Sequence, residues 1–524
     1  MKRRDFIALV AASGGSAYAA MQSLDLLGKP AVAQTSGGSI GSGTFRLPKG
    51  GGGKKVIILG AGLGGMTSAY EMMKVGGYDI TILEARDRAG GRCWTLRDGD
   101  TLTETTGTNQ RCRFRARGET DYFNPGPARI PQHHVTIDYC KELGVELEVF
   151  ANANYQTYYY RDDVPSALSN RPVRVREARA DMRGYISELL AKAIDQNALN
   201  AELSVADQEQ MIAFLQTYGS LDPDLVYTGS SRRGYVEPEG GGLRPGVVGS
   251  PYDLSALINL GFQGYDAFEQ SYDQQMLMFE PVGGMDMIAK AFEREVGSKI
   301  KFGSEVTEIR KTSNGVRVVY RQGGSTRAVT GDYCICNIPL SVLRTIPSDF
   351  SPRMQEAIAS VNYAVTGKSG LMYKNRFWED EDILAGITWT NLPIGTIWYP
   401  SHDYLSKAGL VVGYYNFGST AASFGEMAPR ERVAMAVDLG TRIHGARYRQ
   451  DFVSGVSLFW PQIPYSLGGW ASYSSAVREQ YYPILNQPDG NIYLCGEHLS
   501  YLTGWMAGAF ESARIVTSSI SARS

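Results

Sequence analysis

A glycine-rich loop follows the first strongly apolar run of the chain. The β-branched run 55–59 predicts a buried strand, and a helical pattern occupies 66–74. Between them lies Gly60-Ala61-Gly62-Leu63-Gly64-Gly65. Gly60 permits a tight turn, Gly62 lets the backbone approach a pyrophosphate at the helix N-terminus, and Gly65 lets the helix pack on the strand. The pattern therefore predicts a dinucleotide-binding unit.

An acidic residue ends the next predicted strand. The run 79–83 is apolar and alternating, and Glu84 follows it directly. A carboxylate at this place accepts hydrogen bonds from ribose hydroxyls and repels a 2′-phosphate. The carboxylate therefore disfavours NADP as the dinucleotide.

Size and charge narrow the class of protein. A chain of 524 residues exceeds what one hydrophobic core usually supports, so two or three domains are expected. A formal net charge of −2 offers no basic face for phosphates, so we expect no nucleic-acid partner. With 60 Gly, 31 Tyr and 7 Trp, the composition favours an enzyme with a large cofactor.

The N-terminus predicts export. Lys2-Arg3-Arg4-Asp5-Phe6-Ile7 precedes a mild apolar stretch that glycines interrupt, which resembles a twin-arginine signal. Ala31-Val32-Ala33 fits a cleavage site, so 1–33 is expected to be the signal and 34–53 a flexible leader. The apolar stretch is too short to span a bilayer, and no stable membrane insertion is expected. The predicted location is periplasmic or secreted.

The cysteines and histidines predict neither a disulfide framework nor a metal site. The six cysteines lack the spacing of a small stapled scaffold, and the five histidines form no ligand pattern with them. No metal is expected.

The residues after Glu84 carry a family resemblance. Ala85-Arg86-Asp87-Arg88-Ala89-Gly90-Gly91-Arg92 resembles the second glycine turn of the flavin amine oxidase family. The resemblance extends along nearly the whole chain, through Pro281-Val282-Gly283-Gly284-Met285, the strands at 305–309 and 333–337, Leu494-Cys495-Gly496-Glu497-His498, and Thr503-Gly504-Trp505-Met506-Ala507-Gly508-Ala509. It implies FAD as the cofactor.

The resemblance also implies which residues hold FAD. Val306 would contact the adenine, Glu497 the ribityl-phosphate region, and the helix that starts near Met506 would direct its N-terminus at the flavin. The full implied set is Gly60, Gly62, Gly65, Glu84, Ala85, Arg86, Gly91, Arg92, Val306, Glu497, Met506 and Ala507. Gly469 stands where some members carry a flavin-linked cysteine, so the FAD is expected to be non-covalent.

A second resemblance concerns the substrate. Gly126-Pro127-Ala128-Arg129-Ile130-Pro131-Gln132-His133-His134 resembles the run of L-amino-acid oxidases in which an arginine holds the substrate carboxylate. A guanidinium suits this task because two parallel N–H···O bonds fix orientation. The strand at 410–414 implies a second carboxylate contact from Tyr414, although a one-residue slip would turn Tyr415 inward instead.

Three further residues complete the implied site. Lys368 matches the lysine that holds a water at the flavin, and it would serve reoxidation by O₂. Trp470 and Trp505 match the two aromatic walls beside the flavin, and the Gly504 carbonyl would accept from the substrate amine. No histidine lies between His134 and His402, so a histidine base from the helical region is excluded.

The expected fold class is α/β. A discontinuous Rossmann-like FAD-binding domain takes 54–113, 276–345 and 480–520. A mixed-sheet substrate domain takes 114–160, 251–275 and 346–479. A helical subdomain takes 161–250, with a helical pattern at 187–215 and then a Gly/Pro-rich stretch at 229–251.

These features predict oxidative deamination of L-amino acids, in which hydride passes from Cα to flavin N5 and the products are 2-oxo acids, ammonia and hydrogen peroxide. The partners are then a small amino acid and O₂, and a homo-oligomer is compatible with the sequence. Three alternatives stay open: a monoamine or polyamine oxidase, a flavin monooxygenase that converts amino acids to amides, and a non-catalytic FAD-binding protein.

Overall fold

A parallel five-stranded sheet forms the base of the molecule. The computed structural model describes residues 45–524, and the export signal and most of the leader predicted above lie outside them. The sheet has the order β15-β2-β1-β19-β27, and all its neighbouring strands are parallel. The strands are β1 (Lys54–Leu59), β2 (Tyr78–Leu83), β15 (Ile300–Lys301), β19 (Tyr333–Cys336) and β27 (Ile492–Leu494).

Both faces of this sheet are covered by other elements, and β1 places apolar side chains on each face. Val56 and Ile58 pack with the helices α3 (Leu63–Val75), α9 (Asp286–Val296) and α16 (Met506–Arg523). Ile57 and Leu59 pack on the opposite face, against a three-stranded antiparallel sheet and the helix α11. The covering elements of that face are β16 (Glu305–Thr312), β17 (Gly315–Gln322), β18 (Ser325–Gly331), α10 (Leu340–Leu343) and α11 (Pro352–Ser360). Side chains alternate across a strand, so a continuous apolar run indicates a strand buried on both sides.

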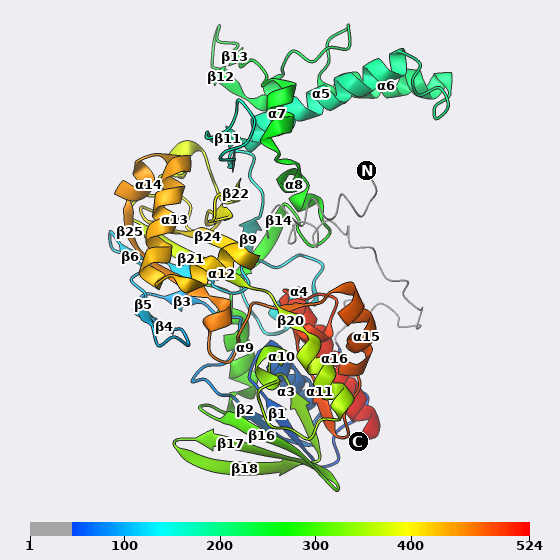
Figure 1. The fold of residues 1–524 in the computed structure, drawn as a ribbon, viewed down its shortest axis with the longest axis vertical. Helices are drawn as coiled ribbons and strands as arrows, with labels where there is room; N and C mark the ends of the chain where they lie inside the picture. The colour runs from blue at the N-terminus through cyan, green and yellow to red at the C-terminus, as the bar shows by residue number, and fades with distance from the viewer. Residues whose placement is uncertain (1–44) are drawn as a thin grey trace.

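A mixed seven-stranded sheet lies above this unit in Figure 1. Its order is β11-β10-β22-β23-β24-β21-β25, with one parallel pair, β10 and β22. The strands are β10 (Tyr158–Tyr160), β11 (Val173–Arg174), β21 (Thr366–Tyr373), β22 (Ile387–Thr390), β23 (Thr396–Trp398), β24 (Gly409–Phe417) and β25 (Phe452–Phe459). The helices α12 (Gly418–Glu426), α13 (Pro429–His444) and α14 (Arg447–Gln450) lie beside it.

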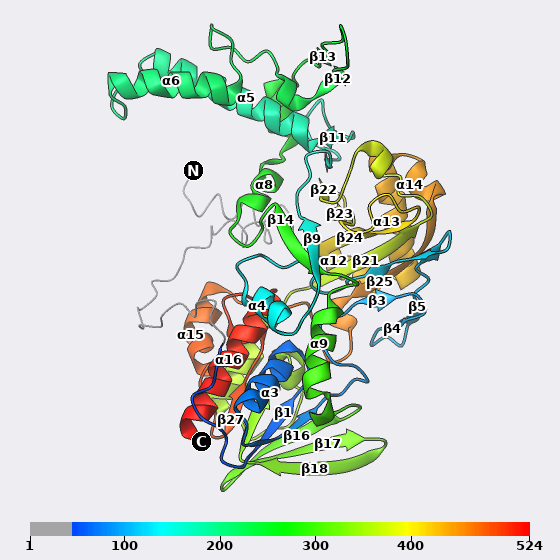
Figure 2. The same cartoon turned by 180° about the vertical axis from the view of Figure 1, so that it is seen from behind.

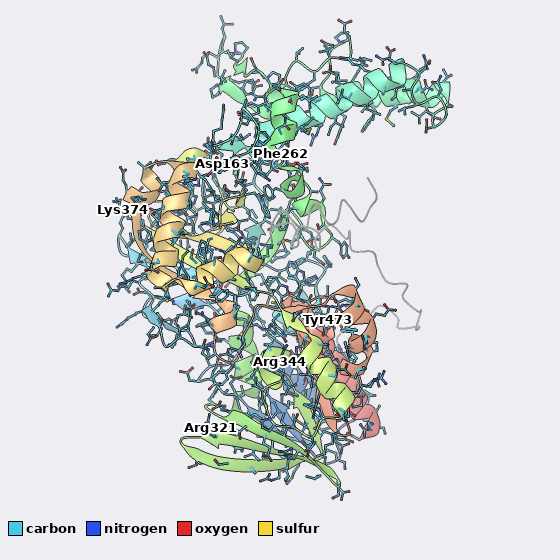
Figure 3. The ribbon with its side chains drawn as sticks, in the orientation of Figure 1. Asp163, Phe262, Arg321, Arg344, Lys374 and Tyr473 are labelled. Atoms are coloured by element: carbon cyan, nitrogen blue, oxygen red, sulfur yellow. The ribbon has the colours of Figure 1, made fainter. Side chains whose placement is uncertain are left out.

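Helices extend from the far end of the molecule. In Figures 1 and 2, α5 (Val175–Asp195) and α6 (Val205–Gly219) project away from the two sheets as an arm. Phe262, labelled in Figure 3, lies where this part meets the seven-stranded sheet, and its ring stacks on Tyr159 at 5.0 Å. The arm is joined to the body through α7 (Leu254–Leu260) and α8 (Gln263–Asp266).

The helical pattern at 187–215 is not one helix. α5 ends at Asp195, Asn197 has a positive φ of 63°, and α6 begins after Ser204, whose side chain accepts a hydrogen bond from Asp207 N. Ser204 marks the start of α6 as a separate helix, because its side chain caps a free N–H group in the first turn of α6. The stretch at 229–251 contains a short hairpin, β12 (Tyr235–Glu237) with β13 (Val247–Val248).

The antiparallel pair β9 (Leu147–Ala151) and β14 (Leu277–Pro281) connects the upper and lower parts. The sequence assigns β14 to the cofactor half, but its partner β9 belongs to the span assigned to the substrate half. Phe279 of β14 also pairs with Ile130 through two backbone hydrogen bonds, of 2.7 and 2.9 Å. Arg129, the residue before Ile130, is therefore held beside β14.

The remaining short elements connect these layers. They are β3 (Leu96–Arg97), β4 (Thr101–Thr103), β5 (Asn109–Arg111), β6 (Arg115–Ala116), β7 (Glu119–Thr120), β8 (Tyr122–Phe123), α4 (Val135–Glu142), β20 (Asn362–Tyr363), β26 (Ala471–Ser472) and α15 (Ser475–Leu485). Within residues 45–524, no helix is both long enough and apolar enough to cross a bilayer.

Candidate active site

One large cavity runs between the two sheets. Its volume is about 1420 Å³, and its lining comes from the β1–α3 loop at one end and from β21, β23 and β24 at the other. The predicted residues that line it are Gly60, Gly62, Glu84, Ala85, Arg86, Gly91, Arg92, Arg129, Val306, Lys368, Trp470, Glu497, Gly504, Trp505 and Met506. Residues from distant parts of the chain thus meet at one site.

The glycines of the β1–α3 loop are required by their backbone conformation or by close neighbours. Gly60 has φ +94°, and a Cβ on Gly62 would lie 2.8 Å from Asn337 Nδ2. A Cβ on Gly65 would lie 2.1 Å from the Gly60 carbonyl oxygen, so this glycine permits the packing of α3 on β1. Gly65 and Ala507 are buried behind the lining rather than part of it.

Glu84 organises the loop around the cavity. Its Oε2 accepts from Ala61 N at 2.7 Å, and its Oε1 accepts from Arg86 N at 2.9 Å. The Arg86 guanidinium donates in turn to Ser466 Oγ at 2.9 Å. One carboxylate therefore ties together the ends of β1 and β2 at the cavity.

An ion pair lies deeper in the same wall. Arg92 Nη1 donates to Glu497 Oε1 at 2.9 Å and to the Gly469 carbonyl at 2.8 Å. Burial opposes the charge of Arg92, but the neighbouring Glu497 carboxylate outweighs it and raises the pKa of Arg92. The helix α16 begins next to this pair, at Met506, with its N-terminal end at the cavity.

The Arg129 guanidinium forms no ion pair with a carboxylate among residues 45–524. Its ring contacts are Trp398, 4.4 Å from the guanidinium carbon, and Phe268, at 5.6 Å. Nη2 donates to Gln274 Oε1 at 2.9 Å, whereas Nε and Nη1 are buried and have no hydrogen-bond partner among residues 45–524. Burial lowers the pKa of Arg129 to about 10, so the group remains a cation at neutral pH.

Lys368 lies close to Arg129. Its Nζ donates to the carbonyls of Asn124, at 3.1 Å, and Gly126, at 3.0 Å, and it lies 4.8 Å from the centre of the Tyr415 ring. Burial, and to a smaller extent repulsion from the Arg129 cation, lowers the pKa of Lys368 to about 7. This amine therefore titrates near neutral pH.

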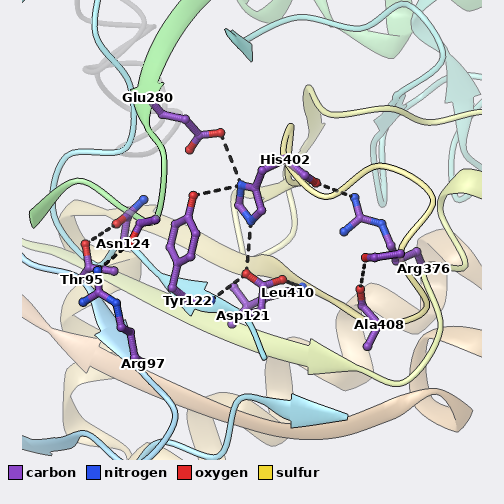
Figure 4. Close-up of polar contacts among 12 residues, drawn as sticks. Thr95, Arg97, Asp121, Tyr122, Asn124, Glu280, Arg376, His402, Ala408 and Leu410 are labelled. Carbon is purple, nitrogen blue, oxygen red and sulfur yellow. Dashed lines mark hydrogen bonds and ion pairs between the residues drawn. The ribbon is translucent and has the colours of Figure 1, made fainter. Parts of the chain in front are cut away.

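A buried ionic cluster holds the segment that Lys368 contacts (Figure 4). His402 Nε2 lies 3.2 Å from Asp121 Oδ1, its Nδ1 lies 3.5 Å from Glu280 Oε1, and its ring stacks on Tyr122 at 4.6 Å. Burial opposes the charge, but hydrogen bonds from the imidazolium to the two carboxylates outweigh this effect and raise the pKa of His402 to about 10. The imidazolium thus joins β14 to the start of the 121–126 segment.

Two indole rings border the space near Arg129 and Lys368. The Trp470 ring lies 3.5 Å from the position that a Cβ on Gly504 would take, and Gly504 has φ +84°. The Trp505 ring packs edge-on against His134 at 5.1 Å. The two tryptophans therefore flank the backbone at Gly504, and their role as walls beside a flavin stays a prediction.

A comparison with known families decides the class of this site. Residues 63–520 match the family described as flavin containing amine oxidoreductase. The chain belongs to that family. The match covers the whole seven-stranded sheet and every strand of the five-stranded sheet except β1, and the α/β fold predicted from the sequence is confirmed.

Curated relatives of this amine oxidoreductase carry L-amino-acid oxidase names. "Putative L-amino-acid oxidase YobN" of Bacillus subtilis (strain 168) is 28% identical over 484 residues, which cover 88% of this chain and 93% of the relative. An L-amino-acid oxidase of Echis ocellatus is 26% identical over 475 residues and covers 88% and 87%.

Solved structures share the fold. Putrescine oxidase bound to putrescine has a TM-score of 0.60 and 17% identity, and covers 90% of this chain and 99% of its own. Cyclohexylamine oxidase from Brevibacterium oxydans IH-35A has a TM-score of 0.59 and 16% identity with the same coverage.

The residues around the cavity fit the flavin cofactor that the family implies. A Cβ on Gly62 or Gly65 would meet a neighbouring atom at less than 3.0 Å, and the N-terminal ends of α3 and α16 both face the cavity, where partial positive charge favours anionic groups. Arg92 and Glu497 offer a charged pair between these two ends.

The structure corrects the prediction for Tyr414. Tyr414 is fully buried in the core beside the seven-stranded sheet, where its hydroxyl shares a 2.7 Å hydrogen bond with Ser457 Oγ and its ring packs on Phe424. Tyr415 lines the cavity instead. In the β21–β24 pair, Lys368 lies opposite Tyr415 and Ser369 lies opposite Tyr414. Directly paired residues share a face, so the face that carries Lys368 also carries Tyr415.

Sequence reasoning missed several residues of the site. Gln274 contacts Arg129 from 145 positions away, and Trp398 reaches it from β23. Histidine and carboxylate side chains also meet without any local sequence signal. In one such set, a ring nitrogen of His133, a ring nitrogen of His134 and a carboxylate oxygen of Asp273 lie within 4.8 Å of one another. Each contact depends on which strands pair, which local patterns do not reveal.

Proposed function

We propose that this chain is an FAD-dependent L-amino-acid oxidase that produces 2-oxo acids, ammonia and hydrogen peroxide. Bound FAD would accept hydride from the substrate Cα at N5 and pass the electrons to O₂. The observation that carries the proposal is Arg129, a buried cation that lines the cavity and has two donor nitrogens without a partner among residues 45–524.

Arg129 supplies what a substrate carboxylate requires. A carboxylate that leaves water needs a cationic partner and matched donors, and a planar guanidinium provides both. Trp398 and Phe268 restrict the guanidinium, so its donors are oriented before substrate arrives. An amine without a carboxylate gains nothing from this arrangement.

Tyr415 takes the second carboxylate contact in this proposal. It lies on the cavity face of β24, and its electrostatic contact with Arg129 places the two side chains near one another. Gly504, between the two tryptophan walls, offers its carbonyl to the substrate amine, and the walls exclude water from the reacting carbon.

Lys368 is proposed to hold a water for the reoxidation step. Two of its ammonium hydrogens are used by backbone carbonyls, which leaves one donor when the group is protonated. Its pKa near 7 lets it exist in both forms under ordinary conditions.

The proposed cofactor is FAD held without a covalent bond. Glu84 suits a ribose, and the cavity extends from the dinucleotide loop to Trp470 and Trp505. Cys93 is the cysteine in the lining, and burial raises the pKa of its thiol well above the ordinary value, which disfavours a thiolate. Mild acid or heat should release all the yellow flavin as free FAD, and flavin that stays on the denatured chain would contradict this assignment.

An amine or polyamine oxidase is the second candidate, because putrescine oxidase and cyclohexylamine oxidase share the fold. A peroxide assay across the twenty L-amino acids and their decarboxylated amines separates the two. The proposal predicts peroxide with amino acids and at most weak signals with the amines. Product analysis separates the monooxygenase alternative, since an amide with CO₂ would replace the 2-oxo acid.

A further inference from the structure

A turn formed by residues 271–275 closes against the segment that carries Arg129. Gln274 Oε1 accepts from Arg129 Nη2 at 2.9 Å, and Gln275 Oε1 accepts from Gln132 N at 3.2 Å. Asp273 Oδ1 lies 2.9 Å from Nε2 of both His133 and His134. The 271–275 turn is thus fastened to the segment 129–134 at three successive positions.

The backbone fixes both sides of this contact. The turn runs directly into β14, and Phe279 of β14 exchanges two backbone hydrogen bonds with Ile130, the residue after Arg129. Gln274 N also donates to the Ser271 carbonyl at 2.9 Å, which shapes the turn itself. The Gln274 side chain therefore reaches Arg129 from a rigid base.

We infer that Gln274 is a positioning residue that fixes the Arg129 guanidinium for the substrate carboxylate. The inference rests on the proposed function and deepens it. An amide oxygen accepts a hydrogen bond without neutralising the cation, whereas a carboxylate at this place would pair with Arg129 and compete with the substrate.

The hydrogen-bond geometry leaves a complete pair of donors. Nη2 carries two hydrogens, one directed to the side of Nε and one to the side of Nη1. Gln274 accepts one of them, and the other then lies beside Nε or Nη1, both of which are unpaired among the described residues. Gln274 thus occupies one two-hydrogen fork of Arg129 and leaves the other without a hydrogen-bond partner among residues 45–524, where a carboxylate could pair with it.

Asp273 connects this arrangement to the wall of the site. Its two histidine contacts anchor the 271–275 turn, and His134 packs edge-on against Trp505. Asp273 and Gln274 both line the cavity, as does Trp505. Arg129, the turn and one aromatic wall are therefore held in a single unit.

The test measures carboxylate binding rather than turnover. Benzoate is titrated into the flavin-loaded parent and the variants Gln274→Glu and Gln274→Leu, and the Kd is read from the flavin absorbance. Gln275→Glu is the matched control. It introduces the same charge at the next residue, whose side chain contacts the backbone N–H of Gln132 and not Arg129. Flavin content and thermal unfolding establish that each variant is folded.

The expected Kd rises by at least about 30-fold in Gln274→Glu, because the new carboxylate competes for the fork, and by about tenfold in Gln274→Leu, because a hydrogen bond to a charged group is lost. Gln275→Glu should stay within about twofold of the parent. Parent-like binding in Gln274→Glu, an equal loss in Gln275→Glu, or no saturable binding to the parent would overturn the inference.

The same titration separates this inference from the proposed function. If benzoate binding depends on Gln274 as expected but no L-amino acid is oxidised, the positioning role stands and the proposed function fails. If amino acids are oxidised and Gln274→Glu binds benzoate like the parent, the positioning role fails and the proposed function stands.

Discussion

Replacing Arg129 with methionine should weaken amino-acid oxidation while FAD binding persists. Arg129 lies at the substrate end of the cavity, near Lys368, Trp398 and Gln274, whereas the dinucleotide loop forms the other end. Methionine preserves the apolar contacts with Trp398 and Phe268 but offers neither charge nor donors. The change therefore removes the proposed carboxylate partner and keeps the apolar contacts.

The size of the effect follows from the burial of the pair. Truncating one partner of a buried, hydrogen-bonded charge pair typically costs about 2–5 kcal/mol, so kcat/KM should fall by roughly 30-fold to several thousand-fold. Lys368 interacts electrostatically with Arg129, so its protonated amine should offset part of the lost charge in the variant. Arg129→Lys should recover part of the activity, because a point charge cannot form the bidentate pair.

A second readout comes from Lys368 itself. Repulsion from Arg129 is one cause of the lowered pKa of Lys368, after burial. Removing the guanidinium should raise that pKa, so the pH at which flavin reoxidation changes should move upward in Arg129→Met. A loss caused by misfolding would not produce this shift.

The assay is stopped-flow reduction of the bound flavin under nitrogen, with an L-amino acid and with the amine left when its carboxylate is removed. The amine should react slowly with the parent and lose little more in Arg129→Met. If the variant keeps the parent rate with the amino acid, Arg129 is not the carboxylate partner and the reasoning is refuted.

Three further predictions concern Lys368, Tyr415 and His402. Lys368→Met should slow reoxidation by O₂ more than reduction by substrate, and the parent's reoxidation rate should change with pH near 7; equal losses in both half-reactions would remove the proposed role. Tyr415→Phe should lower kcat/KM by about 10- to 100-fold, whereas Tyr414→Phe should lower the free energy of unfolding by about 1 kcal/mol with little kinetic effect. Steady-state kinetics and denaturant unfolding measure the two effects, and a kinetic loss in Tyr414→Phe with none in Tyr415→Phe would contradict the assignment. Because the pKa of His402 is raised to about 10 in the folded protein, its stabilisation is complete below about pH 6.5 and is lost as the pH rises to 10. The Tm should therefore fall over that range, and His402→Gln should have a lower Tm at pH 7 and a smaller fall; a parent Tm that does not change from pH 7 to 10 would exclude this linkage.

The dinucleotide site was predictable because its signals are local. A turn at Gly60, the packing of Gly65 on β1 and the carboxylate of Glu84 each follow from a strand and its neighbouring residues. Such contacts span few residues, so the order of residue types determines them. Arg129 was found for a similar reason, through the nine-residue run that surrounds it.

Features that depend on strand pairing were not accessible in the same way. The choice between Tyr414 and Tyr415 requires the register of β24 against β21, and a shift by one residue exchanges the two faces. Once Lys368 is placed in the cavity, the register selects Tyr415. A search for the residue opposite Lys368 would have found it.

Contacts between residues far apart in the sequence could not be predicted from the local sequence patterns. Gln274 contacts Arg129 because β14 pairs with both β9 and Ile130, and neither pairing is visible from the residues near 274. The ionic cluster of His402, Asp121 and Glu280 likewise joins three separated segments. These residues are recognised only when the fold brings their charges together.

We propose that the site binds a substrate that carries both an amine and a carboxylate. The most direct test compares the rates at which L-phenylalanine and 2-phenylethylamine reduce the flavin of the unmodified protein in the absence of oxygen. We expect rapid reduction by L-phenylalanine, or by another L-amino acid in a panel of twenty, and much slower reduction by the matching amine. Equal rates for an amino acid and its amine, or faster reduction by the amine, would contradict the proposal and favour an amine oxidase.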